Sequence, residues 1–342
     1  MKTSHPFVDY SALVRHFKPS CVRLKKRIML ERDQEQYPPV IPAEDQDYYR
    51  NDWTAFAFRA FLRLVKDFRL KVDSFCTIGT GVGLDVLLAI ETFSPRAVFM
   101  TDLTTPVAQI AKRNVFNNLR KPLLYERRRD GSGITEIGCR LFEDKEVFAG
   151  AKFDLIYENL PVLPLYTLDR RGEPYQSASF ASVDDYPSPP QSYVEDLLFT
   201  HYEFLVQAKR FLNPAGAVLC NIGARIQKDK ILEMFDYLGY DTQVVVYDLK
   251  RQTEADSNLP AYKKCSDKTG VNFYFYSYDV IKAFCHLPDY DVLGGLADSW
   301  SRRDIQKMLG EHKLSISEAL ERQNQNLPVA HEVMTILGVP KK

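Results

Sequence analysis

The stretch SFCTIGTGVGLD, residues 74–85, decides the fold. An apolar run ends in three alternating glycines, Gly79, Gly81 and Gly83, and the apolar run GLDVLLAIETF follows at once. This order predicts a buried strand, a tight turn and a helix. Glycines at such a turn let the backbone bend sharply and approach a ligand closely. The stretch therefore predicts an α/β sheet that binds a ligand at the carboxyl end of its strands.

Strand and helix patterns alternate outward from this turn. Further strands are expected at 97–103, 135–142, 153–161, 217–223, 242–249 and 271–279, and helices at 106–118, 193–212 and 229–240. Alternation of this kind indicates a parallel sheet with right-handed crossovers. The sequence thus predicts a doubly wound α/β fold with a mostly parallel seven-stranded sheet.

Three regions follow from these patterns. Residues 1–69 are expected to form a helical N-terminal lid extension, in which a helix over 47–68 follows the proline-rich YPPVIPAED. Residues 70–280 form the ligand-binding α/β domain, and 281–342 a helical C-terminal extension. Its last part, 328–338, is expected to be a short apolar helix that docks on its own domain or on a second copy, which leaves a homodimer open.

Composition excludes several classes of function. Lysine plus arginine number 45 and aspartate plus glutamate 45, so no basic field favours nucleic acid or an anionic membrane. The six cysteines include no CxxC pair and no Cys/His cluster, so no metal is expected. An apolar leader and a long apolar run are also lacking. These features predict a cytoplasmic protein, without nucleic-acid or membrane partners, that acts on a small molecule.

Asp102 indicates which class of ligand the glycine turn would bind. It ends the next predicted strand about twenty residues later, where a carboxylate can accept both hydroxyls of a ribose. The dinucleotide fingerprint GxGxxG, started at Gly79, would need a third glycine where Leu84 stands. The pair therefore favours a nucleoside ligand other than a dinucleotide, over the alternative of an ordinary turn and a surface aspartate.

Asn159 and Pro161 follow the strand FDLIYE, within the segment ENLP. At the carboxyl end of a strand they face the crevice where ligands bind in such sheets. An asparagine oxygen and the next backbone carbonyl can accept two N–H bonds and so orient a planar amide or amine. The alternative is that Asn159 only caps a turn.

Together these motifs resemble the class I S-adenosylmethionine-dependent methyltransferases. The likeness is nearest to the release-factor glutamine N-methyltransferases with an NPPY motif and to their small-molecule relatives; LFE at 141–143 and FLNPAGAVLCNIG at 211–223 extend it. It implies S-adenosylmethionine as cofactor. The residues it assigns to the cofactor are Gly79, Thr80, Gly81 and Gly83 at the amino-acid end, Asp102 at the ribose, Leu103, Leu141 and Phe142 at the adenine, and Asn159 beside the methyl group.

Four positions depart from the family pattern: Thr77, where an acid is common, Arg140, in place of an aspartate near the adenine, and Leu160 and Val162 within the NPPY-like motif. The last two suggest a more apolar acceptor pocket that recruits an aromatic ring from Tyr157, Tyr166 or Tyr175, of which Tyr175 is the candidate at the chemistry. His201, among apolar neighbours, is interpreted as a packed core residue.

The leading hypothesis is N-methylation of a small molecule, with Asn159, Pro161 and Tyr175 at the chemistry and with residues 1–65 and 164–191 closing the pocket. A second hypothesis keeps the cofactor but releases methylthioadenosine, by aminocarboxypropyl transfer or by cyclisation to azetidine-2-carboxylate. A third is a non-catalytic binding protein that retains the fold.

Overall fold

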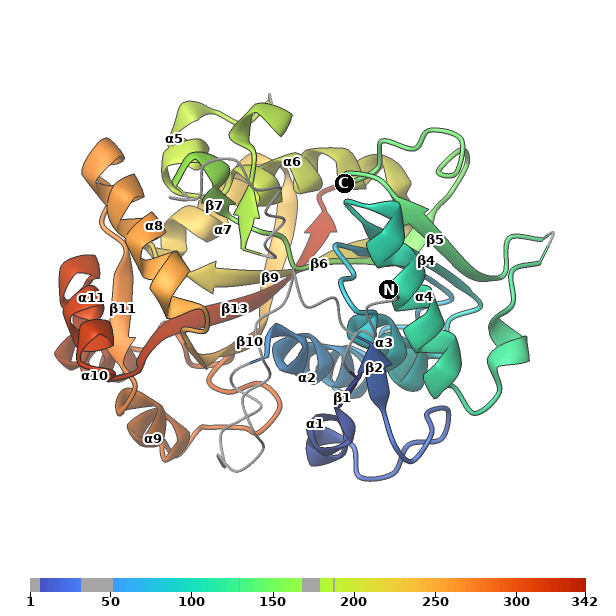
Figure 1. The fold of residues 1–342 in the computed structure, drawn as a ribbon, viewed down its shortest axis with the longest axis horizontal. Helices are drawn as coiled ribbons and strands as arrows, with labels where there is room; N and C mark the ends of the chain where they lie inside the picture. The colour runs from blue at the N-terminus through green and yellow to red at the C-terminus, as the bar shows by residue number, and fades with distance from the viewer. Residues whose placement is uncertain (1–6, 32–51, 129, 168–178, 187) are drawn as a thin grey trace, which may run out of the picture.

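The computed structural model describes residues 7–31, 52–128, 130–167, 179–186 and 188–342 (Figure 1). Its main feature is a nine-stranded sheet in the order β12-β11-β13-β9-β6-β3-β4-β5, with β10 paired to the other edge of β13. The strands are β3 (Ser74–Ile78), β4 (Ala97–Asp102), β5 (Gly133–Gly138), β6 (Phe153–Glu158), β9 (Leu212–Ala224), β10 (Tyr240–Arg251), β11 (Tyr274–Ser277), β12 (Lys313–Ser315) and β13 (Val329–Pro340).

The sheet is doubly wound about β3 and β6, which confirms the predicted fold class. From β3 the chain proceeds through β4 to β5, and from β6 it proceeds the opposite way to β9. All of these neighbours pair in parallel, whereas β13 pairs antiparallel with β9, β10 and β11. The connecting helices are α3 (Leu84–Phe93), α4 (Thr105–Asn118), α5 (Gln191–Glu195), α6 (Phe199–Ala208) and α7 (Lys228–Tyr237).

Two apolar cores lie on opposite faces of the sheet. Alternate residues of β9 belong to different cores: Leu219 lies in one, and Val218 and Cys220 lie in the other. The first core includes residues of α3, α4 and α2 (Trp53–Lys66), and the second includes residues of α6, α7 and α8 (Ala255–Thr269). Figure 1 shows α6 above the central strands and α2 and α3 below them. Side chains on both faces are buried, as expected of a parallel sheet covered by helices.

The seven predicted strands are all present, but the predicted helix at 328–338 is wrong. These residues lie in β13, which is paired with β9 on one edge and β10 on the other. From Val329 to Gly338 every residue is buried, because the strand is covered on both faces. Such a strand has no polar alternation to mark it, so a short apolar run could not be distinguished from a buried helix.

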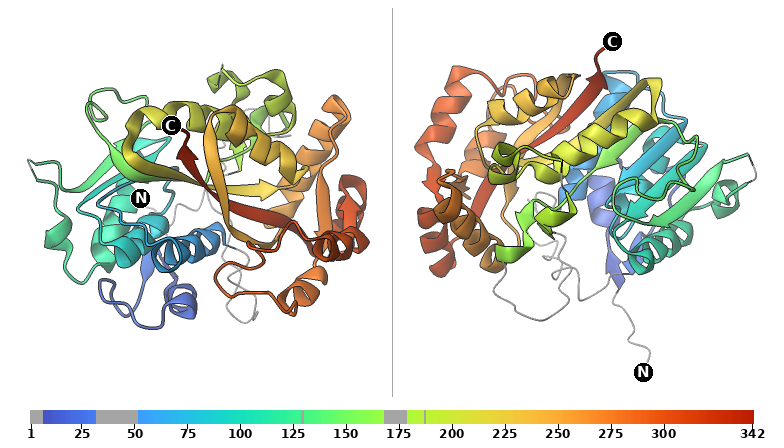
Figure 2. Two further views of the ribbon diagram at one scale, coloured as in Figure 1. Left: turned by 180° about the vertical axis from the view of Figure 1, so that it is seen from behind. Right: turned by 90° about the horizontal axis from the view of Figure 1, so that it is seen from above.

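The rest of the C-terminal region contains the helices α9 (Val280–Cys285), α10 (Arg303–Glu311) and α11 (Ile316–Asn324) beside the far end of the sheet (Figure 2), together with β12 and a non-helical stretch over 286–302. A pair of two-residue strands, β7 (Leu163–Pro164) and β8 (Phe180–Ala181), closes the segment after β6. No helix in the described ranges is long and apolar enough to cross a membrane.

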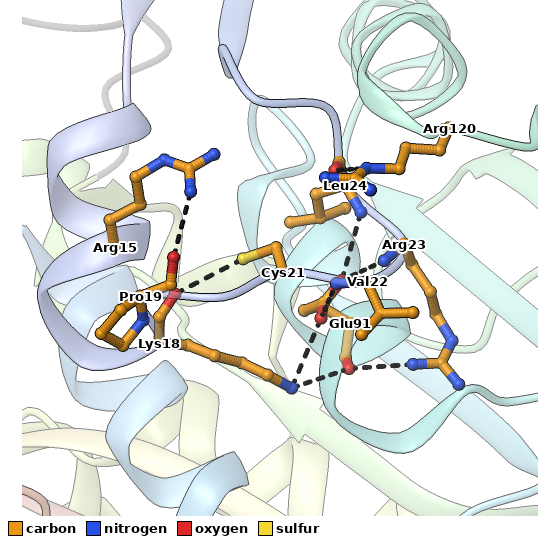
Figure 3. Close-up of polar contacts among 9 residues, drawn as sticks. All are labelled: Arg15, Lys18, Pro19, Cys21, Val22, Arg23, Leu24, Glu91 and Arg120. Atoms are coloured by element: carbon orange, nitrogen blue, oxygen red, sulfur yellow. Dashed lines mark hydrogen bonds and ion pairs between the residues drawn. The ribbon is translucent and has the colours of Figure 1, made fainter.

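The N-terminal segment holds β1 (Phe7–Asp9), α1 (Ser11–Phe17) and β2 (Met29–Glu31). Buried Glu91 of α3 attaches it (Figure 3), since its carboxylate accepts the backbone N–H groups of Val22 at 2.8 Å, Arg23 at 2.7 Å and Leu24 at 3.2 Å. The Lys18 ammonium lies 3.4 Å from the same carboxylate. Three successive N–H groups and a cation thus compensate one buried charge.

Candidate functional site

The candidate site is a pocket at the point where the sheet reverses its winding. Gly79 follows β3 and Asn159 follows β6, and these adjacent strands end side by side. In doubly wound sheets ligands bind at this switch point, outside the carboxyl ends of the strands. Residues from both predicted closing segments also line the pocket: Tyr10, Asp52, Trp53 and Thr54 from residues 1–65, and Ser179 from residues 164–191.

The glycine turn has the conformation that its sequence requires. Gly79, Gly81 and Gly83 have φ values of 76°, 54° and 82°, in the left-handed region that side chains disfavour. Gly83 is also the N-cap of α3, and a Cβ atom there would lie 2.9 Å from the carbonyl oxygen of Ala111. The turn is fixed to β4, because the N–H groups of Gly79 and Thr80 both donate to the carbonyl oxygen of Thr101.

Asp102 lies at the tip of β4, against the turn. Its carboxylate accepts the N–H of Gly81 at 2.8 Å and that of Leu103 at 2.8 Å. Burial raises the pKa of Asp102 to about 6, although these backbone hydrogen bonds oppose the rise. Asp102 therefore holds the glycine turn and presents its carboxyl at the sheet's edge.

A second acid, Asp85, lines the pocket itself. It belongs to the first turn of α3 and accepts hydrogen bonds from the hydroxyls of Thr77 and Thr80, the latter at 2.9 Å. Burial raises the pKa of Asp85 to about 6, and the charge of Asp102 adds to the rise. Asp85 thus places a carboxyl group beside Thr77, where the family pattern predicted an acid.

The turn at Asn159 rests on a buried acid and a buried histidine. Glu158 Oε2 accepts the N–H of Leu160 at 3.0 Å, and Glu158 Oε1 lies 2.8 Å from Nδ1 of His201 in α6. The other ring nitrogen of His201 has no partner among the described residues, and His201 lines the pocket. His201 was interpreted as a packed core residue. It is buried, but its polar contact with Glu158 supports the strand end that carries Asn159.

Asn159 has its side chain half-buried in the pocket wall. Within the described ranges its amide makes no hydrogen bond, so it is available to a ligand. A Cβ atom at Gly79 would lie 3.6 Å from the backbone oxygen of Asn159 and from Cδ2 of Leu160. A side chain at position 79 would therefore be in van der Waals contact with the ENLP segment, which shows how closely the two turns approach.

The wall on the side of β9 and β10 carries two buried cations. Arg225 directly follows β9 and donates from Nε and Nη2 to Gln252 Oε1, at 3.2 and 2.9 Å. Lys250 of β10 donates to the carbonyl oxygen of Arg251 and the hydroxyl of Thr253, both at 3.1 Å. Their charges lie over aromatic faces, Arg225 over Tyr262 at 5.0 Å and Lys250 over Trp53 at 5.1 Å.

The structure brings only some of the predicted residues to the pocket. Gly79, Thr80, Gly81, Asn159 and Pro161 line it. Gly83, Asp102, Leu103, Leu141 and Phe142 are not among its lining residues; Phe142 stacks on Phe211 at 4.6 Å, and Leu103 is exposed. Tyr175 lies outside the described residues. Arg140 pairs with Glu143 and Asp185.

Several lining residues were missed, namely Asp52, Trp53, Asp85, His201, Arg225, Lys250 and Glu254. Only Asp85 had a signal, since it directly follows the glycine turn in sequence. The others come from elements whose carboxyl or amino ends meet only in the folded sheet. No group of three or more potential metal ligands occurs in the described part of the chain.

Comparisons with known proteins give similarity in structure alone. No protein-family model and no curated protein matches the sequence. The solved structures similar to this chain include the ribosomal protein L11 methylase from Lactobacillus delbrueckii subsp. bulgaricus, with 15% identity, a TM-score of 0.35, and coverage of 64% of this chain and 87% of that one.

Two more are a precorrin-6y C5,15-methyltransferase from Geobacter metallireducens and a SAM-dependent methyltransferase from Geobacter sulfurreducens in complex with S-adenosyl-L-homocysteine. The first has 12% identity and a TM-score of 0.33 over 66% of this chain and 87% of that one. The second has 10% identity and a TM-score of 0.34 over 82% and 90%. Similarity at this level does not identify a shared activity, so the function depends on the geometry of the site.

Proposed function

We propose that this chain is an enzyme that binds S-adenosylmethionine and transfers its methyl group to a nitrogen of a small molecule. One observation carries the proposal: the glycine turn after β3 and the Asn159 turn after β6 lie side by side and line one pocket. A ligand held on the first turn would have its reacting centre beside the second. Proximity and orientation are the main requirements for attack on an activated methyl group.

The acids of the pocket fit a cationic nucleoside. The raised pKa of Asp85 means that burial leaves its negative charge poorly compensated, and an ammonium group beside it would supply the missing charge. A dinucleotide would instead bring its pyrophosphate towards Asp85 and Asp102. The residues present therefore fit S-adenosylmethionine, with Asp85 near the amino group and Asp102 near the ribose.

Asn159 would hold the acceptor. Its free amide oxygen and the adjacent backbone carbonyl can accept two N–H bonds, and this aims the nitrogen lone pair at the methyl carbon. Glu158 and His201 keep that turn in place from behind. When bound, the cofactor supplies a sulfonium whose thioether leaves as the methyl group is transferred.

The test is to incubate the purified protein with S-adenosylmethionine, first alone and then with a metabolite extract, and to quantify both products by mass spectrometry. S-adenosylhomocysteine that forms only with extract supports methyl transfer. Asn159→Ala should lower that turnover at least ten-fold. The matched control is Asn117→Ala, an exposed asparagine on α4, which should leave it unchanged. Absence of both binding and turnover in the unaltered protein would refute the proposal.

Asp85 also favours a second candidate, cyclisation of the cofactor to azetidine-2-carboxylate. That reaction requires the cofactor's own amine to lose a proton before it attacks the γ-carbon and displaces methylthioadenosine. A buried carboxylate with a pKa of about 6 at the proposed amino-acid end could accept this proton. Methylthioadenosine formed without extract, and lost in Asp85→Asn, would support cyclisation over methyl transfer.

A further inference from the structure

The two cations on the β9–β10 side of the pocket are unusual in having only neutral partners. Arg225 is 6% exposed and Lys250 1% exposed, and both line the pocket. Their hydrogen bonds go to an amide oxygen, a carbonyl oxygen, a hydroxyl and the ring nitrogen of His331, and neither forms an ion pair with a described carboxylate. Buried cations are normally paired with an acid, because burial removes the water that stabilises them.

The charges of the surrounding groups confirm that this cluster is short of negative charge. Burial and, after it, the charge of Arg225 lower the pKa of Lys250 to about 7, while Asp52 and Glu254 oppose the change. The pKa of His331, 2.9 Å from Arg225 Nη2, lies well below its ordinary value because of burial and of these two cations. An anion in the pocket would relieve the repulsion between Arg225 and Lys250.

Two aromatic rings and a glycine position the cations and leave their N–H groups available to a ligand. The rings of Tyr262 and Trp53 support the two charges without using their N–H groups. Gly223 leaves room for the guanidinium, since a Cβ atom there would lie 2.2 Å from Arg225 Nη1. These features position a guanidinium and an ammonium toward one cavity.

The acidic side chains near Arg225 and Lys250 limit which anions can bind there. Asp52 accepts the N–H of Thr54 at 2.8 Å and Glu254 accepts the hydroxyl of Ser179 at 2.7 Å, and both line the same pocket. A doubly charged phosphate would be repelled by them, whereas a zwitterion brings an ammonium group that Asp85 would receive from the cofactor and Asp52 and Glu254 from an acceptor amino acid. A mixed set of two cations and two acids matches the carboxylate and ammonium of an α-amino acid.

We propose that Arg225 and Lys250 form a carboxylate site for the amino-acid group of a ligand in this pocket. The inference rests on the proposed function, because the carboxylate belongs either to the methionyl group of S-adenosylmethionine or to an amino acid that serves as methyl acceptor. Both ligands would present a carboxylate to Arg225 and Lys250, and the experiments distinguish the two.

The first measurement compares the affinities of S-adenosylmethionine and methylthioadenosine, which lacks the amino-acid group. Arg225→Met should weaken S-adenosylmethionine binding about ten- to hundred-fold if the carboxylate is the cofactor's, with methylthioadenosine affected less than about two-fold. Arg225→Lys should restore part of the affinity, and Gly223→Ala, which displaces the guanidinium, should reproduce part of the loss. Lys230→Met serves as the control, because Lys230 lies on α7 and its ammonium pairs with Asp196, outside the pocket.

The second measurement does not depend on the cofactor. The Lys250 ammonium is titrated by NMR in lysine-labelled protein, with its signal assigned by Lys250→Arg. L-methionine should raise the Lys250 pKa, whereas methioninol, which lacks the carboxylate, should not. If the rise persists with S-adenosylmethionine bound and Arg225→Met leaves cofactor affinity unchanged, the carboxylate is the acceptor's.

The proposal is overturned if neither L-methionine nor S-adenosylmethionine changes the Lys250 pKa and Arg225→Met binds the cofactor normally. A protein that does not bind S-adenosylmethionine but shows the L-methionine effect would refute the proposed function and retain the carboxylate site.

Discussion

Replacing Asp85 with asparagine should stabilise the ligand-free protein at neutral pH. The folded protein raises the pKa of this carboxyl from 3.8 to about 6, mainly through burial. Because the folded value exceeds the unfolded one, ionisation of Asp85 disfavours the folded state. The penalty is absent well below pH 3.8, grows between pH 3.8 and 6, and is constant above. It amounts to about 1.5 kcal/mol at pH 5 and about 3 kcal/mol at pH 8.

Urea unfolding of Asp85→Asn and of the unaltered protein, followed by circular dichroism at pH 5 and pH 8, measures this difference. The variant should be more stable at both values and by a larger margin at pH 8, while its S-adenosylmethionine affinity falls at least ten-fold. An equal margin at the two pH values, or a less stable variant at pH 8, would refute the argument that the ionised carboxylate is poorly compensated.

Asp154→Asn is the matched control, because this replacement should change the stability in the opposite direction. Burial raises the pKa of Asp154, but hydrogen bonds from Asn213 and from the backbone of Ser74 and Asp73 outweigh it and lower the pKa below 3.8. The ionised form of Asp154 thus stabilises the fold, and this contribution is lost as the pH falls through the folded pKa. Asp154→Asn should therefore be less stable than the unaltered protein at pH 8.

Three further outcomes are expected. Asp102→Ala, which frees the Gly81 N–H, should weaken S-adenosylmethionine binding at least ten-fold in calorimetry, and unchanged affinity would contradict the ribose role. Glu158→Gln should lower turnover about ten-fold with cofactor affinity within about two-fold, because it loosens the Asn159 turn; an equal fall in affinity would assign Glu158 to the cofactor wall instead. Glu91→Ala leaves three backbone N–H groups, of which that of Leu24 is buried, without their acceptor and should cost about 3 kcal/mol in urea unfolding, with faster hydrogen exchange at residues 22–24.

The local parts of the fold could be predicted from the sequence because they are encoded locally. The glycine turn, Asp102 and the strands about them follow from short patterns of apolar residues and glycines. β13 could not be recognised in this way, since its identity depends on being placed between β9 and β10. Its partners lie about a hundred residues earlier in the chain, and nothing within the run itself specifies them.

The same distinction applies to the residues of the candidate site. Gly79 and Asn159 were identified because each directly follows a recognisable strand, and the structure places them together. Arg225 and Lys250 lie in segments that read as ordinary strands and loops, and only burial without an acidic partner distinguishes them. The interpretation of His201 as a buried core residue is confirmed, but its contact with Glu158 could not be predicted because Glu158 lies on another element.

The position of β13 also matters for how the chain is made. Synthesis produces β9 and β10 well before the strand that separates them, so for an interval each exposes an unpaired edge to its surroundings. Unpaired edges recruit other strands, either from the same chain in a wrong register or from neighbouring chains. Closing the gap also requires contacts over a long sequence separation, which slows folding. Yield of active protein should consequently depend on how fast residues 329–340 follow and on chaperones that shield the two edges until then.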